Sequence, residues 1–154
     1  MLDELRDRVI GKKLAILGVG NPLRGDDGIG PALIERLQGK TSAILINAGD
    51  VPENYLGVVQ AAQPAVVLIV DAVELGAKPG DAALIEVEQL GGVIATTHNT
   101  SLAPFAQMIR AETGADVFVV AIQPATGSLG APMSAEVKAT LEYLDKWFQA
   151  LRID

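Results

Sequence analysis

The run VVLIV at residues 66–70 decides the fold class, because all five of its side chains are apolar. A strand with two apolar faces is typical of the centre of a parallel sheet that helices cover on both sides. Shorter apolar runs alternate with amphipathic stretches along the rest of the chain, which predicts an α/β fold. We expect further strands at residues 14–18, 43–46, 83–87 and 117–122, and helices at 29–38, 53–62, 101–114 and after Ser134.

One strand of this sheet is expected to run against the others. The segment between Asp71 and the strand at 83–87 is only about a dozen residues long and contains Gly76, Pro79 and Gly80. That is too short and too broken for the helical crossover that parallel pairing requires. The prediction is therefore one domain over residues 1–154, a three-layer α/β sandwich. Its twisted sheet has five strands, mostly parallel with one antiparallel, and helices on both faces.

Composition narrows the function classes. Hydrophobic residues make up 49% of the chain, and the formal net charge is -7, which argues against nucleic acid or an anionic membrane as the main partner. There is no cysteine, so disulfides, thiolate metal sites and cysteine nucleophiles are excluded. Residues 1–11 are charged and lack the apolar stretch of a signal peptide, and the longest apolar run is too short to span a bilayer. We therefore expect a cytoplasmic protein.

The segment GVGNPLRGDDGIG at residues 18–30 invites comparison with phosphate-binding loops. A dinucleotide-binding fingerprint would need a glycine in place of Leu23. The glycine spacing of a P-loop is present, but Asp26 and Asp27 occupy the lysine and serine/threonine positions. Two carboxylates would repel phosphate, so the loop suits a cation or a positively charged group. Alternatively, the two acids complement the dipole of the following helix.

Two more polar positions follow predicted strands. Asp71 comes directly after the apolar run and needs a partner there, either in a site or as the cap of a nearby loop or helix. His98, the single histidine, lies in the polar segment TTHNT at 96–100. It is a candidate ligand, base or proton carrier, or else an exposed loop residue. We expect Asp27, Asp71 and His98 to meet at the carboxyl edge of the sheet. Two carboxylates and an imidazole suit a divalent transition metal such as zinc or nickel.

Four ordered motifs resemble those of the hydrogenase maturation protease family. They are GVGNPLRGDDGIG (18–30), VLIVDAVELGAKPG (67–80), TTHN (96–99) and AIQP (121–124). The last motif is similar to the branch that serves the large subunits of formate-hydrogenlyase-type hydrogenases. The resemblance extends from Lys13 to the last helix, so it covers nearly the whole chain.

The resemblance implies an endopeptidase that removes the C-terminal extension of a nickel-iron hydrogenase large-subunit precursor after nickel insertion. The nickel would arrive with the substrate, and the enzyme would hold no cofactor tightly. Carried over by position, the metal-contacting and catalytic residues fall on Asp27, Asp71 and His98, with Asp26 in a supporting role.

The chain departs from the family pattern after the second strand, where the family commonly carries an aspartate followed by glycines. Asn47 stands at that position. Either Asp50 replaces the missing acid, or the position only shapes the loop. Two other functions would also fit: a non-catalytic nickel-binding chaperone using the same three residues, and a nucleotide-binding domain, which the acids of the glycine-rich loop disfavour.

Overall fold

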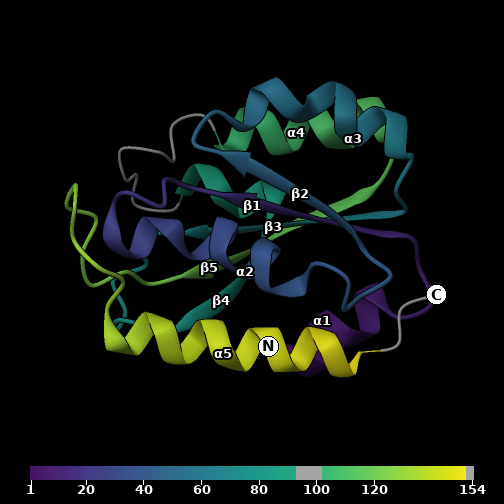
Figure 1. The fold of residues 1–154 in the computed structure, drawn as a ribbon. Helices are drawn as coiled ribbons and strands as arrows, with labels where there is room; N and C mark the ends of the chain where they lie inside the picture. The colour runs from purple at the N-terminus through teal and green to yellow at the C-terminus, as the bar shows by residue number, and fades with distance from the viewer. Residues whose placement is uncertain (93–101, 152–154) are drawn as a thin grey trace.

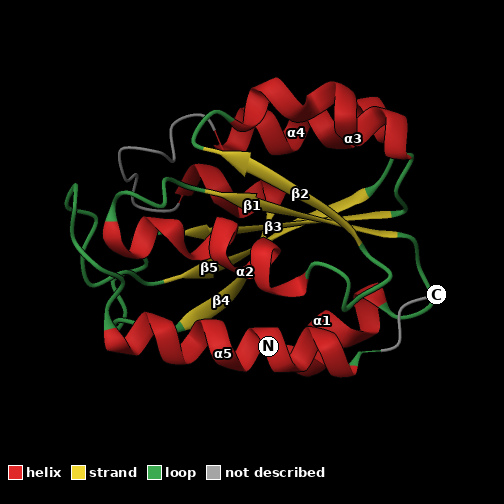
Figure 2. Cartoon of the chain, in the orientation of Figure 1, coloured by secondary structure: helices red, strands yellow, loops and turns green. Residues whose placement is uncertain are grey.

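Five strands form one sheet in the computed structural model, which describes residues 1–92 and 102–151 (Figures 1 and 2). The strands are β1 (Leu14–Val19), β2 (Ile44–Gly49), β3 (Val66–Ala72), β4 (Ala82–Glu86) and β5 (Asp116–Ile122). The α-helices of the described residues are α1 (Leu2–Val9), α2 (Ile29–Leu37), α3 (Leu56–Ala62), α4 (Leu102–Thr113) and α5 (Ala135–Ala150). The VVLIV run forms most of β3, the middle strand of the sheet.

The strand order is β2-β1-β3-β5-β4, and the predicted mixture of strand directions is confirmed. β1 pairs in parallel with β2 and β3, and β3 pairs in parallel with β5. β4 runs antiparallel to β5, with Ala82 opposite Ile122 and Glu86 opposite Phe118. The short connection from β3 turns back at Gly80, whose N–H donates to the carbonyl of Gln123 at 2.8 Å. A connection of this kind can join antiparallel strands without a crossover helix.

The side chains of β3 point alternately into two separate cores. Val66, Leu68 and Val70 pack in the core that α1, α2 and α5 cover. Val67 and Ile69 pack in the core that α3 and α4 cover. The resulting three layers are seen in Figure 1, with α3 and α4 above the sheet and α1 and α5 below it. The predicted α/β class, with helices on both faces, is confirmed.

The N-terminal helix α1 was not among the predicted elements. Residues 1–11 contain many charges, but Leu5 and Val9, four residues apart, are fully buried. Such spacing places both side chains on one face of a helix. Arg8, between them, forms ion pairs with Glu86 of β4 and Asp116 of β5. The charged residues are thus the solvent-facing and ion-pairing side of an amphipathic helix.

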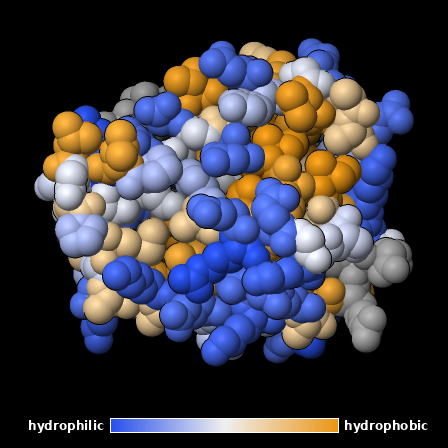
Figure 3. All heavy atoms as spheres, in the orientation of Figure 1, coloured by the Kyte–Doolittle hydropathy of each residue, from blue (hydrophilic) through white to orange (hydrophobic). Residues whose placement is uncertain are grey.

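One helical prediction differs in detail from the structure, and another is confirmed. The expected helix at 53–62 begins as a 3₁₀ turn, Pro52–Tyr55, and becomes α-helical only in α3. The helix after Ser134 is confirmed: the Ser134 hydroxyl accepts the N–H of Val137 at 3.3 Å, as an N-cap does. The outer surface of α5 is hydrophilic (bottom of Figure 3). None of the helices within the described ranges is long and apolar enough to cross a membrane.

Candidate active site

The glycine-rich segment serves close packing at the carboxyl ends of β1 and β3. A Cβ atom on Gly30 would lie 2.5 Å from the carbonyl oxygens of both Val19 and Val70. A Cβ on Gly20, whose φ is +138°, would lie 1.8 Å from the carbonyl oxygen of Asp27. Only glycine fits at such approaches. The start of α2 therefore rests directly on the sheet, and the 3₁₀ turn that precedes it, Gly25–Gly28, contacts β3.

Asp26 is fully buried and bound within the protein. Its carboxylate accepts hydrogen bonds from the backbone N–H groups of Ala125 at 2.8 Å, Thr126 at 3.1 Å and Ser134 at 2.7 Å. It also accepts the hydroxyl hydrogen of Ser134 at 2.9 Å. These four donors come from the segment that joins β5 to α5. Asp26 thus ties the glycine-rich loop to that segment and has little capacity left for a ligand.

Asp27, the next residue, is 6% exposed and belongs to the loop that faces the sheet edge. Its Oδ2 accepts the N–H of Asn21 at 2.8 Å, and its own N–H donates to the carbonyl of Arg24 at 3.0 Å. These bonds fix the position of the side chain. The two neighbouring acids of the sequence therefore have different surroundings, as expected for successive side chains of a tight turn.

Asp71 differs from the other buried polar residues because its carboxylate has no hydrogen-bond partner among the described residues. It lies in β3 opposite Ala121 of β5 and is completely buried. Burial raises the pKa of Asp71 well above its usual range, and the negative charge of Asp27 raises it further. The adjacent N–H of Ala72 acts in the opposite direction but does not complete a hydrogen bond.

Asp27 and Asp71 belong to elements that contact each other, the 3₁₀ turn Gly25–Gly28 and β3, and their joint role in a site stays a prediction. The negative charge of Asp27 adds to the effect of burial and raises the pKa of Asp71 further. A buried carboxylate without a donor is costly, and a cation bound between two such groups would offset both the burial and the repulsion. The pair is thus suited to a divalent cation and unsuited to phosphate.

The prediction for His98 lies outside the described residues. Four residues further along the chain, Leu102 begins α4, which packs on the same face of the sheet as Asp71. Within residues 1–92 and 102–151, no group of three histidine, cysteine, aspartate or glutamate side chains could hold a metal. Asp27 and Asp71 lie within the described part of the chain and His98 does not, and a metal-contacting role for all three stays a prediction.

Asn47 and Asp50, the two alternatives after the second strand, are both exposed. The Asn47 side-chain oxygen accepts the N–H of Gly49 at 3.2 Å, and the carbonyl of Gly49 accepts the N–H of Gly20 at 2.8 Å. Asn47 thus shapes the end of β2 where it meets the glycine-rich loop. An aspartate could accept the same bond, so the replacement preserves the turn.

Gln123 is an organising residue that the sequence analysis missed. It is 4% exposed, and its Oε1 accepts the N–H groups of Leu75 at 2.7 Å and Ala77 at 3.2 Å. Its Nε2 donates to Glu74 Oε2 and to the carbonyl of Pro124, both at 3.0 Å. The available signal was a polar residue directly after the apolar run of β5. Its side chain fixes the loop that leaves β3 just beyond Asp71.

Two exposed leucines lie in the loops at this end of the sheet. Leu23 is 68% exposed and Leu129 is 67% exposed. Their loops are joined by a hydrogen bond from the N–H of Gly130 to the carbonyl of Leu23 at 2.7 Å. The glycine-rich loop that carries the acids therefore has two exposed apolar side chains, one within it and one on the loop bonded to it.

Comparisons with known proteins agree on one family. Residues 29–147 match the family model described as hydrogenase maturation protease. The chain is 32% identical over 130 residues to the hydrogenase 3 maturation protease of Escherichia coli K12, covering 82% of this chain and 83% of that protein.

Solved structures extend the agreement to the fold. The crystal structure of the [NiFe] hydrogenase maturation protease HycI from Thermococcus kodakarensis KOD1 superimposes with a TM-score of 0.87 at 32% identity. It covers 96% of this chain and 97% of that one. The solution structure of the endopeptidase HycI from Escherichia coli gives a TM-score of 0.80 at 28% identity, covering 92% and 96%. The chain therefore belongs to the hydrogenase maturation protease family and is a peptidase.

Proposed function

We propose that this peptidase removes the C-terminal extension of a nickel-iron hydrogenase large-subunit precursor after nickel insertion, and that Asp27, Asp71 and His98 contact the substrate's nickel. The observation that carries the proposal is the Asp71 carboxylate, which is fully buried and has no hydrogen-bond donor among the described residues. Such a group is retained against its free-energy cost where it has a ligand to bind.

The chemistry of the donor set supports a nickel ion as the recognised feature. Carboxylate oxygens and an imidazole nitrogen suit divalent nickel, and the chain has no cysteine to offer a competing thiolate site. Without a cation, Asp27 raises the pKa of Asp71 because the two negative charges repel. A nickel-free precursor gives nothing to relieve that repulsion. The same two aspartates would thus favour the nickel-loaded precursor over the empty one.

Hydrolysis requires that water add to the scissile carbonyl and that the peptide C–N bond then break. Nickel held by the three side chains would position the extension beside the carboxyl edge of the sheet, where it can polarise a carbonyl or activate water. The nickel belongs to the substrate, so no tightly held cofactor of the enzyme is needed. The exposed Leu23 and Leu129 beside the site suit a large protein substrate better than a small molecule.

The non-catalytic chaperone would use the same three residues, but no observation favours it, and the family is one of peptidases. The glycine pattern does not favour nucleotide binding, because Gly20 and Gly30 allow close packing of the backbone and the loop carries the carboxylate of Asp27. The cytoplasmic location stays a prediction.

A cleavage assay tests the proposal directly. The candidate large-subunit precursor, nickel-loaded or nickel-free, is incubated with the unmodified chain, with Asp71→Asn and with His98→Ala, and its mass is measured. Asp7→Asn, which changes an exposed aspartate of α1, is the matched control. We expect loss of a C-terminal peptide only from the nickel-loaded precursor, and only with the unmodified chain and the control. Binding of the nickel-loaded precursor without cleavage would instead support the chaperone.

A further inference from the structure

β4 is an edge strand, and no strand of the described residues pairs with the outer side of its backbone. It is last in the strand order, and within residues 1–92 and 102–151 its only sheet partner is β5. The N–H of Gln123 donates to the carbonyl of Asp81 at 2.8 Å. This bond shows which residues of β4 direct their backbone groups toward β5. Bonded pairs alternate along such a ladder. The backbone groups of Ala83 and Ile85 therefore point toward β5, and those of the residues between them point outward.

The outward-pointing N–H and C=O groups belong to Ala82, Leu84 and Glu86. The N–H of Glu86 agrees with this pattern, because it donates to the side-chain oxygen of Gln89 at 2.8 Å and not to β5. No hydrogen bond of the described chain reaches the outward groups of Ala82 or Leu84, and both residues are partly exposed. Ala82 and Leu84 thus present outward donors and acceptors that no described residue binds, whereas the N–H of Glu86 is already bonded to Gln89.

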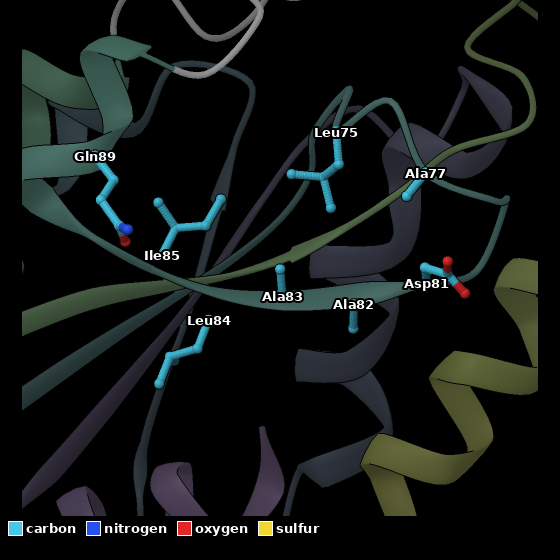
Figure 4. A pocket seen from close by; sticks show the side chains of 8 residues that line it. All are labelled: Leu75, Ala77, Asp81, Ala82, Ala83, Leu84, Ile85 and Gln89. Carbon is cyan, nitrogen blue, oxygen red and sulfur yellow. The ribbon is translucent and has the colours of Figure 1, made fainter.

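Surface hollows lie on both sides of this free edge. The first, of about 540 Å³, runs along β4 and includes Leu75, Ala77, Ala83, Leu84, Ile85 and Gln89 (Figure 4). The second lies on the side of α5 and includes Gly80, Thr140, Tyr143 and Leu144. Asp81 and Ala82 line both hollows. Figure 4 shows Ala83 and Ile85 pointing to one side of the strand, and Ala82 and Leu84 to the other.

We propose that the free edge of β4 binds an extended segment of the precursor's polypeptide as a sixth strand, with its alternate side chains in the two hollows. This inference rests on the proposed function. In strand addition, backbone hydrogen bonds provide affinity and flanking pockets for alternate side chains provide specificity. Asp81, present in both hollows, favours basic or neutral side chains over acidic ones in the bound segment.

The register of the sheet supports a substrate segment as the occupant. Ala83 lies opposite Ala121, and Ala121 lies opposite Asp71, so the three residues form one row across the sheet. With about 4.8 Å between neighbouring strands, β4 at this level is roughly 10 Å from Asp71. A segment held along β4 would therefore run level with the proposed nickel contact, so the same precursor could reach both.

Amide hydrogen exchange provides a test with a control within the strand. In the free chain, the amides of Ala83 and Ile85 should exchange slowly, and those of Ala82 and Leu84 quickly. Addition of the nickel-loaded precursor should slow exchange at Ala82 and Leu84 by about 10-fold or more. Unchanged exchange at these two amides in a precursor-bound sample would overturn the proposal. Protection that grows with the concentration of this chain alone would also overturn it, because the occupant would then be a second copy.

A pair of variants at one residue tests whether the outward N–H contributes to binding. Ala82→Pro removes this N–H at the first residue of an edge strand, where proline is tolerated. Ala82→Val adds a side chain of similar size but keeps the N–H. We expect Ala82→Pro to raise KM for the nickel-loaded precursor about 3- to 10-fold relative to Ala82→Val, with kcat unchanged. Equal KM values for the two folded variants would contradict strand addition.

The two assays separate failure of this inference from failure of the proposed function. Cleavage without protection at Ala82 and Leu84 would leave the peptidase function intact and reject the strand addition. Protection at both amides without any cleavage would support the docking edge and reject the proposed hydrolysis.

Discussion

Asp26 and Asp71 are both fully buried aspartates at the same end of the sheet, but their surroundings are opposite. Asp26 accepts hydrogen bonds from three backbone N–H groups and a hydroxyl. Asp71 accepts none from the described residues, and it faces the charge of Asp27. Burial alone therefore does not mark a functional acid. The useful distinction is whether the fold supplies the partners that a buried carboxylate needs.

The same substitution, aspartate to asparagine, should separate the two roles. The largest effect is expected on activity at Asp71. Asp71→Asn removes one of two charges proposed to contact the nickel, so cleavage of the nickel-loaded precursor should fall by at least about 100-fold. Cleavage kinetics with the precursor in excess measure this loss. Activity within a factor of two of the unmodified chain would remove Asp71 from the proposed site.

Asp26→Asn should act on stability instead. The amide has one acceptor oxygen in place of two, and its NH₂ group would face donors that now point at a carboxylate. We expect the free energy of unfolding to fall by about 2–4 kcal/mol, because hydrogen bonds to a charged group are lost and buried donors are left unsatisfied. Urea denaturation measures the change. A neutral result would show that Asp26 is not the tie between the glycine-rich loop and the segment before α5.

The effect of Asp71 on stability should have the opposite sign and depend on pH. The folded state holds the Asp71 proton more tightly than the unfolded state, because burial and Asp27 raise its pKa above the ordinary value of 3.8. The resulting stabilisation is complete below that value and is lost as the pH rises through the folded-state pKa. Asparagine does not titrate, so Asp71→Asn should stabilise the free chain at neutral pH, by about 1–3 kcal/mol.

Denaturation of the unmodified chain and Asp71→Asn at several pH values measures this difference. The advantage of the variant should shrink as the pH is lowered toward 3.8. An advantage that grows on acidification would mean that the carboxylate has a favourable partner in the free protein.

The substitution Gly30→Ala should shift the turn that carries Asp27 relative to Asp71 without changing either aspartate. Gly30→Ala would place a Cβ 2.5 Å from the carbonyls of Val19 and Val70, so α2 must shift away from the sheet. We expect a loss of about 1–3 kcal/mol in stability from overpacking, together with a loss of nickel-dependent cleavage. Gly57→Ala, in α3 where a Cβ meets nothing within 4 Å, is the control. Full activity in Gly30→Ala would show that the packing of α2 does not position the site.

The central strand of the sheet and the burial of Asp71 could be predicted from the sequence for the same reason. An apolar run of strand length must be buried, and a carboxylate at its end then lacks solvent, so both conclusions follow from local sequence. The partners of Asp26 could not be found in this way, because they lie 99 to 108 residues away along the chain. Helix α1 was missed because its two buried residues, Leu5 and Val9, are few among many charges. The contacts of Gln123 likewise depend on how the loop after β3 folds back.

The smallest effect is expected where the chain departs from its family. Asn47 accepts one hydrogen bond, from the N–H of Gly49, and its side chain is exposed. Asn47→Asp keeps that acceptor, so the free energy of unfolding should change by less than about 0.5 kcal/mol. If the position only shapes the end of β2, cleavage of the nickel-loaded precursor should also stay within about twofold. A large gain in cleavage would mean instead that the acid restores a group of the reaction, and that the pair Asp27 and Asp71 is an incomplete account of the carboxylates at this sheet edge.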